Sequence, residues 1–110
     1  MTVSVSLDLD DPFEVAVADI VEMNRRKRRD YALDGEWDTN FRQTADHFGI
    51  SVWESAEFNV VQKLSRLKSL RANGRMEGGE ANESVADTYL DLAVYGVLMY
   101  ALYRNAKFGS

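Results

Sequence analysis

Residues 83–103 decide the fold, and they read Glu83-Ser84-Val85-Ala86-Asp87-Thr88-Tyr89-Leu90-Asp91-Leu92-Ala93-Val94-Tyr95-Gly96-Val97-Leu98-Met99-Tyr100-Ala101-Leu102-Tyr103. No proline interrupts this stretch, and apolar residues recur in it at steps of three and four: Leu92, Tyr95, Met99 and Leu102. This spacing is typical of a helix, so the stretch predicts one long helix. Beyond Asp91 the sequence is apolar nearly all round, which predicts burial in a core or in a subunit interface.

The same helix begins with a row of carboxylates. Glu83, Asp87 and Asp91 follow one another at steps of four residues, so they lie along one helical face. Acids at the entrance of a buried helix are costly unless a cation compensates them. A lysine, an arginine or a divalent metal would serve.

Length and composition limit the classes of protein. The chain has 110 residues, which fits one domain, and its hydrophobic share of 45% predicts a folded core. The net charge of −5 argues against binding nucleic acid in bulk. There is no cysteine and only one histidine, which excludes thiol chemistry, disulfides and Cys- or His-rich metal sites.

The sequence carries no recognisable membrane or export signal. No run of about 18 apolar residues is free of charge, and the N-terminus lacks a basic-then-apolar leader. We therefore expect a soluble, cytoplasmic protein that does not enter the membrane.

Read in order, the chain predicts an all-α fold: a small bundle of four helices, one of them short, behind an N-terminal extended arm. The arm covers residues 1–10 and the single helical domain residues 11–106. We expect helices over about 11–29, 39–48 and 51–73, a surface link over 74–81, and the last helix from a cap at Asn82 or Ser84.

Local end signals support these bounds. Asp11-Pro12-Phe13-Glu14 is a typical helix start, and Ser51-Val52-Trp53-Glu54 has the spacing of a capping box. Gly49 follows the short helix at the position where a left-handed residue ends one. Trp53, Ala56, Val60, Leu64 and Leu67 form the expected inward stripe of the third helix.

The first helix ends in the basic run 25–29, Arg-Arg-Lys-Arg-Arg. One interpretation is a solvated cluster that complements the negative end of the helix dipole. The other is a phosphate-contacting cluster. Tyr31 and Trp37 follow it closely and are the candidates for stacking a nucleobase.

Two acidic sets could meet in a bundle: Glu54 with Glu57, and Glu83 with Asp87 and Asp91. Oxygen ligands on facing helices suit Mg²⁺, which substrate phosphates often complete. The competing explanation is structural, because Glu54 serves the capping box and acids are favoured in a first helical turn. Asp91 is the acid that this explanation covers least.

Four segments together resemble the phage-borne nucleotide modification associated helical domain family. They are Arg29-Asp30-Tyr31-Ala32, Asn40-Phe41-Arg42, Lys63-Leu64-Ser65-Arg66-Leu67 and residues 83–95. The resemblance covers roughly residues 20–104, and the last segment is the specific one. Gln62 stands where the family has Asp before the lysine, which removes one carboxylate from the third helix.

The chain is more distantly similar to the MazG-like all-α nucleotide pyrophosphohydrolases, which hold Mg²⁺ on Glu-x-x-Glu and Glu-x-x-Asp. Glu54 and Glu57 match the first spacing. Asp87 and Asp91 are four residues apart rather than three, so this similarity is an analogy and not a shared motif.

The resemblance implies a phage protein that binds or processes a nucleotide. The aromatic last helix separately predicts a homo-oligomer, because its apolar surface exceeds what one thin bundle can cover. In the nucleotide hypothesis Mg²⁺ lies on the acids and the chemistry falls to Asp87, Asp91 and Lys63; if the protein is hydrolytic, a metal-bound water attacks a phosphoanhydride. Nucleotide contacts are then expected from Arg42, Arg66, Tyr31 and Asn40. The alternative is a non-enzymatic protein that binds a host factor or sequesters a signalling nucleotide, with its carboxylates paired internally to lysine and arginine.

Overall fold

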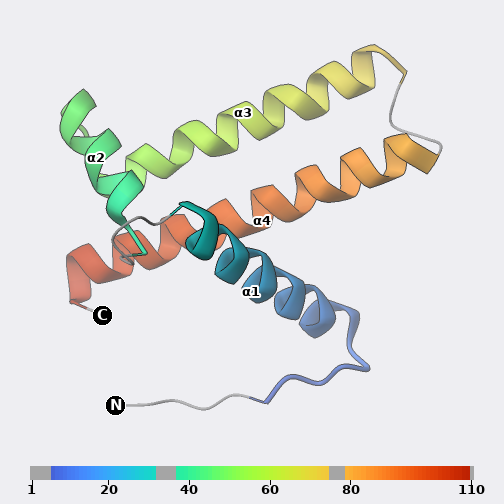
Figure 1. Cartoon of the computed structure of the whole chain (residues 1–110), viewed down its shortest axis with the longest axis horizontal. Helices are drawn as coiled ribbons and strands as arrows, with labels where there is room; N and C mark the ends of the chain where they lie inside the picture. Colours follow the sequence, from blue (N-terminus) through green and yellow to red (C-terminus); the bar gives the residue numbers. More distant parts are fainter. Residues whose placement is uncertain (1–5, 32–36, 75–78, 110) are drawn as a thin grey trace.

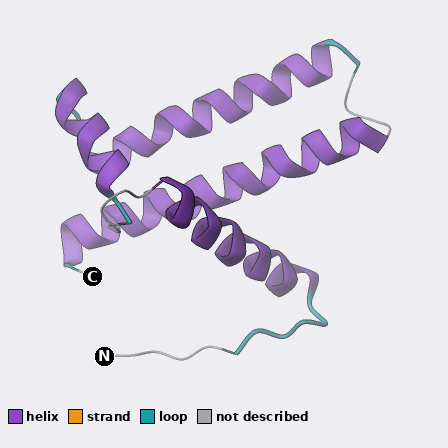
Figure 2. Ribbon diagram, in the orientation of Figure 1, coloured by secondary structure: helices purple, strands orange, loops and turns teal. Residues whose placement is uncertain are grey.

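The structure is a computed structural model that describes residues 6–31, 37–74 and 79–109, with the side chains at 30, 31 and 79–83 outside the described part. Over these residues the chain forms helices α1 (Pro12–Tyr31), α2 (Thr39–Phe48), α3 (Val52–Ala72) and α4 (Gly79–Phe108). Residues 6–10 precede α1 without regular structure, and the described part holds no strand (Figure 2). The predicted all-α fold is confirmed.

The two long helices form the frame of the molecule. α3 and α4 run antiparallel and pack on each other more extensively than any other pair, while α1 crosses α4 and α2 packs against the start of α3 (Figure 1). Among the described helices α1 packs only on α4. The frame therefore places side chains of α1, α2 and α3 around the middle of α4.

Local signals set most of the helix ends. Ser51 Oγ accepts from the Glu54 N–H and the Glu54 carboxylate accepts from the Ser51 N–H, each at 3.3 Å, so the predicted capping box is present. Gly49 ends α2 with φ +66°, which glycine adopts without strain. Asp11 Oδ1 accepts from the Phe13 N–H at 3.0 Å and thus caps α1.

The predicted start of α4 was wrong. The helix begins at Gly79, and Ser84 lies inside it, where its carbonyl accepts from Thr88 Oγ1 at 2.7 Å. Packing against α3 extends a helix past weak local signals, because each added residue costs little once the helix exists. Residues 75–78 of the expected link lie outside the described part.

The core of the single chain is small. Its buried apolar residues are Ala45, Ala56, Leu67, Val94 and Leu102. The predicted burial of the second half of α4 is wrong for the isolated chain, since Val97 is 52% and Tyr100 64% exposed. Leu64 is 52% exposed as well, because the stripe that faces α4 runs through Val60 and Leu67 and leaves Leu64 at its edge.

One helix, over Ser84–Phe108, is long and apolar enough to cross a membrane by length and composition alone. A single such helix is weak evidence for a membrane span; in this fold it packs against α3 and α1, and 17% of its apolar window is buried.

Candidate functional site

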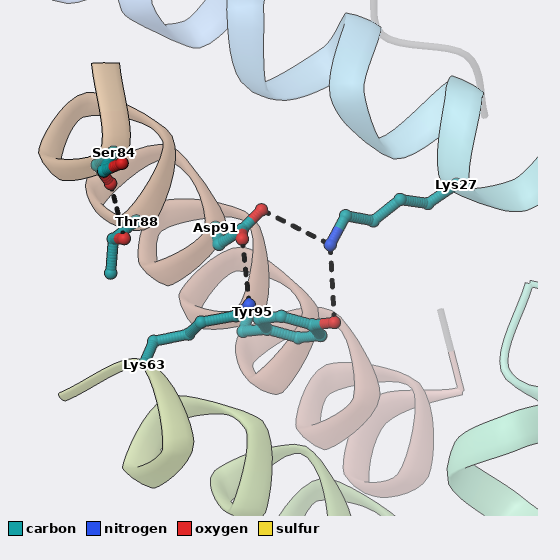
Figure 3. Close-up of polar contacts among 6 residues, drawn as sticks. All are labelled: Lys27, Lys63, Ser84, Thr88, Asp91 and Tyr95. Carbon is teal, nitrogen blue, oxygen red and sulfur yellow. Dashed lines mark hydrogen bonds and ion pairs between the residues drawn. The ribbon is translucent and has the colours of Figure 1, made fainter. Parts of the chain in front are cut away.

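Asp91 lies where three helices meet. Its Oδ2 is 3.1 Å from Lys63 Nζ on α3, and its Oδ1 is 3.4 Å from Lys27 Nζ on α1 (Figure 3). The three side chains are 19–28% exposed, so solvent screens these ion pairs only in part. The cation that the sequence required for Asp91 is thus a pair of lysines.

Tyr95 lies one turn beyond Asp91 and holds Lys27 from the other side. Lys27 Nζ donates to Tyr95 Oη at 3.4 Å and lies 4.7 Å from the centre of the ring (Figure 3). An ammonium in this position gains a cation–π interaction as well as a hydrogen bond. Lys27, Asp91 and Lys63 together carry a net charge of +1, and of these three residues Lys27 also lines the cavity described next.

A cavity of about 150 Å³ opens beside this cluster, and all four helices contribute to its lining. Three amides line it, Asn24, Asn40 and Asn59, and with them lie Lys27, Arg28, Trp37, Thr39, Phe41, Tyr95 and Leu98. Three further cavities in the described part of the chain share residues with it, and one of them, of about 430 Å³, shares Trp37 alone. One of about 410 Å³ shares Asn40, Phe41 and Asn59, and one of about 330 Å³ shares Asn24, Arg28, Trp37 and Leu98.

The lining favours an anion. Lys27 and Arg28 are its two charged residues, and no carboxylate is among the described residues that line it. The first three residues of α2 also border it, and the N-terminal end of a helix carries partial positive charge. Aromatic faces beside amides and cations are the surfaces that stack a ring, read its polar edge and hold a phosphate.

The predicted magnesium ligands do not come together in the described part of the chain. Asp91 is held by two lysines, Glu54 belongs to the capping box, and Glu57 and Asp87 are exposed. No group of three or more His, Cys, Asp or Glu side chains that would hold a metal occurs among the described residues. Glu83 lies outside the described side chains. The described carboxylates form no such group, and the magnesium site stays a prediction.

The hydrogen bonds of Ser51 determine the ionisation of Glu54. The Ser51 hydroxyl first, and its backbone N–H second, stabilise the carboxylate and lower the pKa of Glu54 below its usual value. The side chain lies at the surface, so the shift reflects helix capping and not a catalytic environment.

Only some of the predicted nucleotide contacts lie at the cavity. Asn40 lines the cavity, and Lys63 holds Asp91 beside it. Arg42 pairs with Asp38 at 3.2 Å, and Arg66 is exposed on α3. Tyr31 lies outside the described side chains, whereas Trp37, the other stacking candidate, does line the cavity.

Asn24 and Asn59 line the cavity and were not singled out from the sequence. The signal available was an amide among apolar neighbours. Asn24 occupies a step of the apolar stripe of α1, and Asn59 precedes Val60 and Val61 on α3. Only the crossing of α1 over α4 shows that the two amides reach one cavity.

No protein-family model, no curated protein and no solved structure matches this sequence. The resemblance to nucleotide modification associated domains therefore stays a prediction, and the cavity is the feature from which a function can be proposed.

Proposed function

We propose that the protein binds a nucleotide, or a nucleotide-like aromatic anion, in the cavity between α1, α2, α3 and α4. The observation that carries the proposal is the composition of the lining: two cations, three amides and three aromatic side chains, with no carboxylate among its described residues. The base would stack on Trp37 or Phe41, with an edge toward Asn40 or Asn59, and the phosphate would lie near Arg28 and Lys27.

The size of the cavity limits which part of the ligand it encloses. An engineered protein cavity of about 150 Å³ accommodates benzene, so a single aromatic ring fits a space of this volume. The adjoining cavities, which share lining residues with it, offer room for the sugar and phosphate. We therefore assign the cavity of about 150 Å³ to the ring and the adjoining cavities to the sugar and phosphate.

The arrangement around Asp91 favours binding of the nucleotide without hydrolysis. A magnesium ion at Asp91 would have to displace both Lys63 and Lys27 from its oxygens, and it would then lie close to two ammonium groups. Internal pairing of Asp91 is what the alternative hypothesis required of a protein that holds a nucleotide without chemistry. A metal-independent binding or sequestering role fits this arrangement.

The first experiment measures thermal stability against a panel of nucleotides and deoxynucleotides, each with Mg²⁺ and with a chelator. A ligand at 100 times its dissociation constant adds about 2.7 kcal/mol, which raises the midpoint of a domain of this size by several degrees. We expect one nucleotide class to stabilise the protein equally well in the chelator. Absence of a shift with every nucleotide would overturn the proposal.

Matched variants localise the ligand. Arg28→Gln should reduce the shift strongly, because Arg28 lines the cavity, while Arg26→Gln makes the same charge change on the same helix outside the lining. Equal losses in both variants would mean general attraction by the basic run instead of a site. A shift that requires Mg²⁺ and disappears in Asp91→Asn would favour the metal-dependent hypothesis.

Trp37 provides a direct readout. The chain has two tryptophans, and Trp53 packs against Tyr103 with ring centres 5.3 Å apart, outside the cavity lining. In Trp53→Phe the remaining fluorescence reports Trp37, so a nucleotide that stacks there should quench it. A nucleotide that stabilises the protein without changing this signal would bind elsewhere.

A further inference from the structure

Among the described residues, α1 and α2 cover one side of the α3–α4 frame, and the other side is exposed. On α3, Ser55 and Asn59 line the cavities next to α2, Lys63 pairs with Asp91, and the three lie along one edge of the helix. The helical period puts Glu57, Val61 and Leu64 on the other edge, and Val61 is 59% and Leu64 52% exposed. On α4 the same side carries Tyr89, which is 52% exposed, and Tyr100.

The bare edge of α3 has a regular sequence, which we call the outer seam. Its six residues alternate in steps of three and four, and every one of them is exposed: Glu54, Glu57, Val61, Leu64, Lys68 and Arg71. Steps of three and four mark the contact line of a helix that packs against another helix. The acids stand at the start of the seam, the apolar pair in its middle, and the bases at its end.

When two copies of the seam run antiparallel, the acids at the start of one seam face the bases at the end of the other. A two-fold axis between Gln62 and Lys63 would bring two copies of the seam together antiparallel. Val61 would then face Leu64 of the second copy, and Glu57 would face Lys68 of the second copy. Glu54 and Arg71 of the second copy would form the outermost pair.

The same two-fold axis also brings the α4 helices of the two copies together. The Lys63–Asp91 ion pair and the Trp53–Tyr103 contact fix the level of α4 against α3, and at that level the axis passes between Leu92 and Ala93. Tyr89 would then lie opposite Gly96 of the second copy. A Cβ added at Gly96 would meet nothing within 4 Å, so the single chain leaves this space open.

The bare side of the frame is large enough for an interface. A standard interface buries about 800 Å² per partner, from about 20–30 residues. The frame consists of helices of 21 and 30 residues, and Val61, Leu64, Tyr89 and Tyr100 on this side are each more than half exposed.

From the seam and its charge order we propose that the protein is a two-fold symmetric homodimer. The bare side of its α3–α4 frame packs on the same side of a second copy, with α3 antiparallel to α3. The dimer covers Tyr89 and Tyr100, which the single chain leaves exposed, and keeps the nucleotide cavity open on the outer side. The inference does not depend on what the cavity binds.

The first test is the dimer dissociation constant by sedimentation equilibrium, with circular dichroism as the control for folding. Leu64→Glu should weaken the dimer roughly a hundredfold or more, because each interface would bury two unpaired charges. The side chain is exposed in the single chain, so helicity should persist. Phe13→Glu is the matched control, since Phe13 is 74% exposed on α1, away from the seam, and should leave the dimer intact.

Charge reversal tests the antiparallel pairing itself. Glu57→Lys and Lys68→Glu should each weaken the dimer roughly tenfold, and the double variant should restore it, because opposite charges then face each other again. Glu57 and Lys68 are 11 residues apart on one straight helix, so they cannot pair within a chain. Additive losses in the double variant would overturn the proposed register.

Cross-linking gives the geometry directly, since the natural chain has no cysteine. A mixture of Val61→Cys and Leu64→Cys chains should form a mixed disulfide under mild oxidation, while Ser69→Cys on the opposite edge of α3 should not. A monomer at all concentrations, or a dimer indifferent to Leu64→Glu, overturns the proposal. So does binding of the wild type to anionic phospholipid vesicles that Leu64→Glu abolishes, which would assign the bare side to a membrane.

Discussion

Lys63 and Asp91 join the two long helices: Lys63 Nζ lies 3.1 Å from Asp91 Oδ2, with Lys27 at the other carboxylate oxygen. An aspartate among Leu90, Leu92 and Ala93 is thereby explained by its partners. The cluster links α1, α3 and α4 at one level, and Lys27 also lines the cavity.

We expect Asp91 and Lys63 to be coupled in the absence of metal. A double-mutant cycle of Asp91→Asn and Lys63→Gln, measured by urea unfolding in a chelator, should give a coupling energy of about 1 kcal/mol, between the values for exposed and buried pairs. Asp91→Asn alone should cost about 1–3 kcal/mol, since it leaves two ammonium groups uncompensated. A coupling that appears only with Mg²⁺ would contradict the ion-pair assignment.

The capping box at Ser51 should make part of the stability depend on pH. Because the folded pKa of Glu54 is lowered, the folded state takes up this proton less readily than the unfolded state. The contribution of Glu54 is therefore fully present above its unfolded pKa and is lost as the pH falls through the lower folded pKa. Glu54→Gln should destabilise the protein at about pH 7, and its difference from wild type should shrink as the pH falls below the unfolded value of about 4.3.

Glu22→Gln is the control for this titration, because Glu22 is exposed on α1 and stands outside any cap. Its stability difference from wild type should stay near zero throughout. A loss of the Glu54 contribution on raising the pH would reverse the expected sign and would contradict the assignment.

Leu102 should be among the costliest apolar positions to truncate. Its side chain is 1% exposed where α4 packs on α3, and removal of such a side chain to alanine costs about 2–5 kcal/mol. Val97→Ala, five residues earlier on the same helix, is the comparison, because Val97 is 52% exposed and should lose under about 1 kcal/mol. Chemical denaturation of both variants measures the contrast.

Replacing Gly49 should destabilise the protein, although no neighbouring atom crowds the position. A Cβ there meets no atom within 4 Å, so the cost of Gly49→Ala lies in its φ of +66° alone and should be about 1 kcal/mol. Gly96→Ala serves as the opposite case in the monomer, where it should stabilise the helix by about 0.5–1 kcal/mol. Equal effects of the two substitutions would show that backbone conformation is not the cause.

Local sequence signals predicted much of this fold. The bounds of α2 and the capping box of α3 follow from Gly49, Ser51 and Glu54, because each acts on its own helix within four residues. The start of α4 was missed because the local cap signals at Asn82 and Ser84 lie inside a helix that begins at Gly79 and packs along α3. Signals that act over a few residues carry no information about such support.

The candidate site was predicted only in part, for a related reason. The sequence identified Asp91 as needing a cation and named Lys63, Asn40 and Trp37 as candidates, but it directed the acids toward a metal. Which cation reaches Asp91 depends on how α1 crosses α4, since Lys27 is 64 residues away in the chain. Which residues of the four helices come together cannot be predicted until the crossing of the helices is known.

The way in which α1 is attached affects how the protein opens locally. α1 packs on α4 alone among the described helices, and Lys27 is its polar anchor to Asp91 and Tyr95. α1 can therefore detach as one unit while the α3–α4 hairpin stays formed, and its amide hydrogens should exchange with solvent earlier than those of α3 and α4. Since Asn24, Lys27 and Arg28 leave together with α1, the cavity exists only in the closed form, and a ligand should slow amide exchange across the whole of α1.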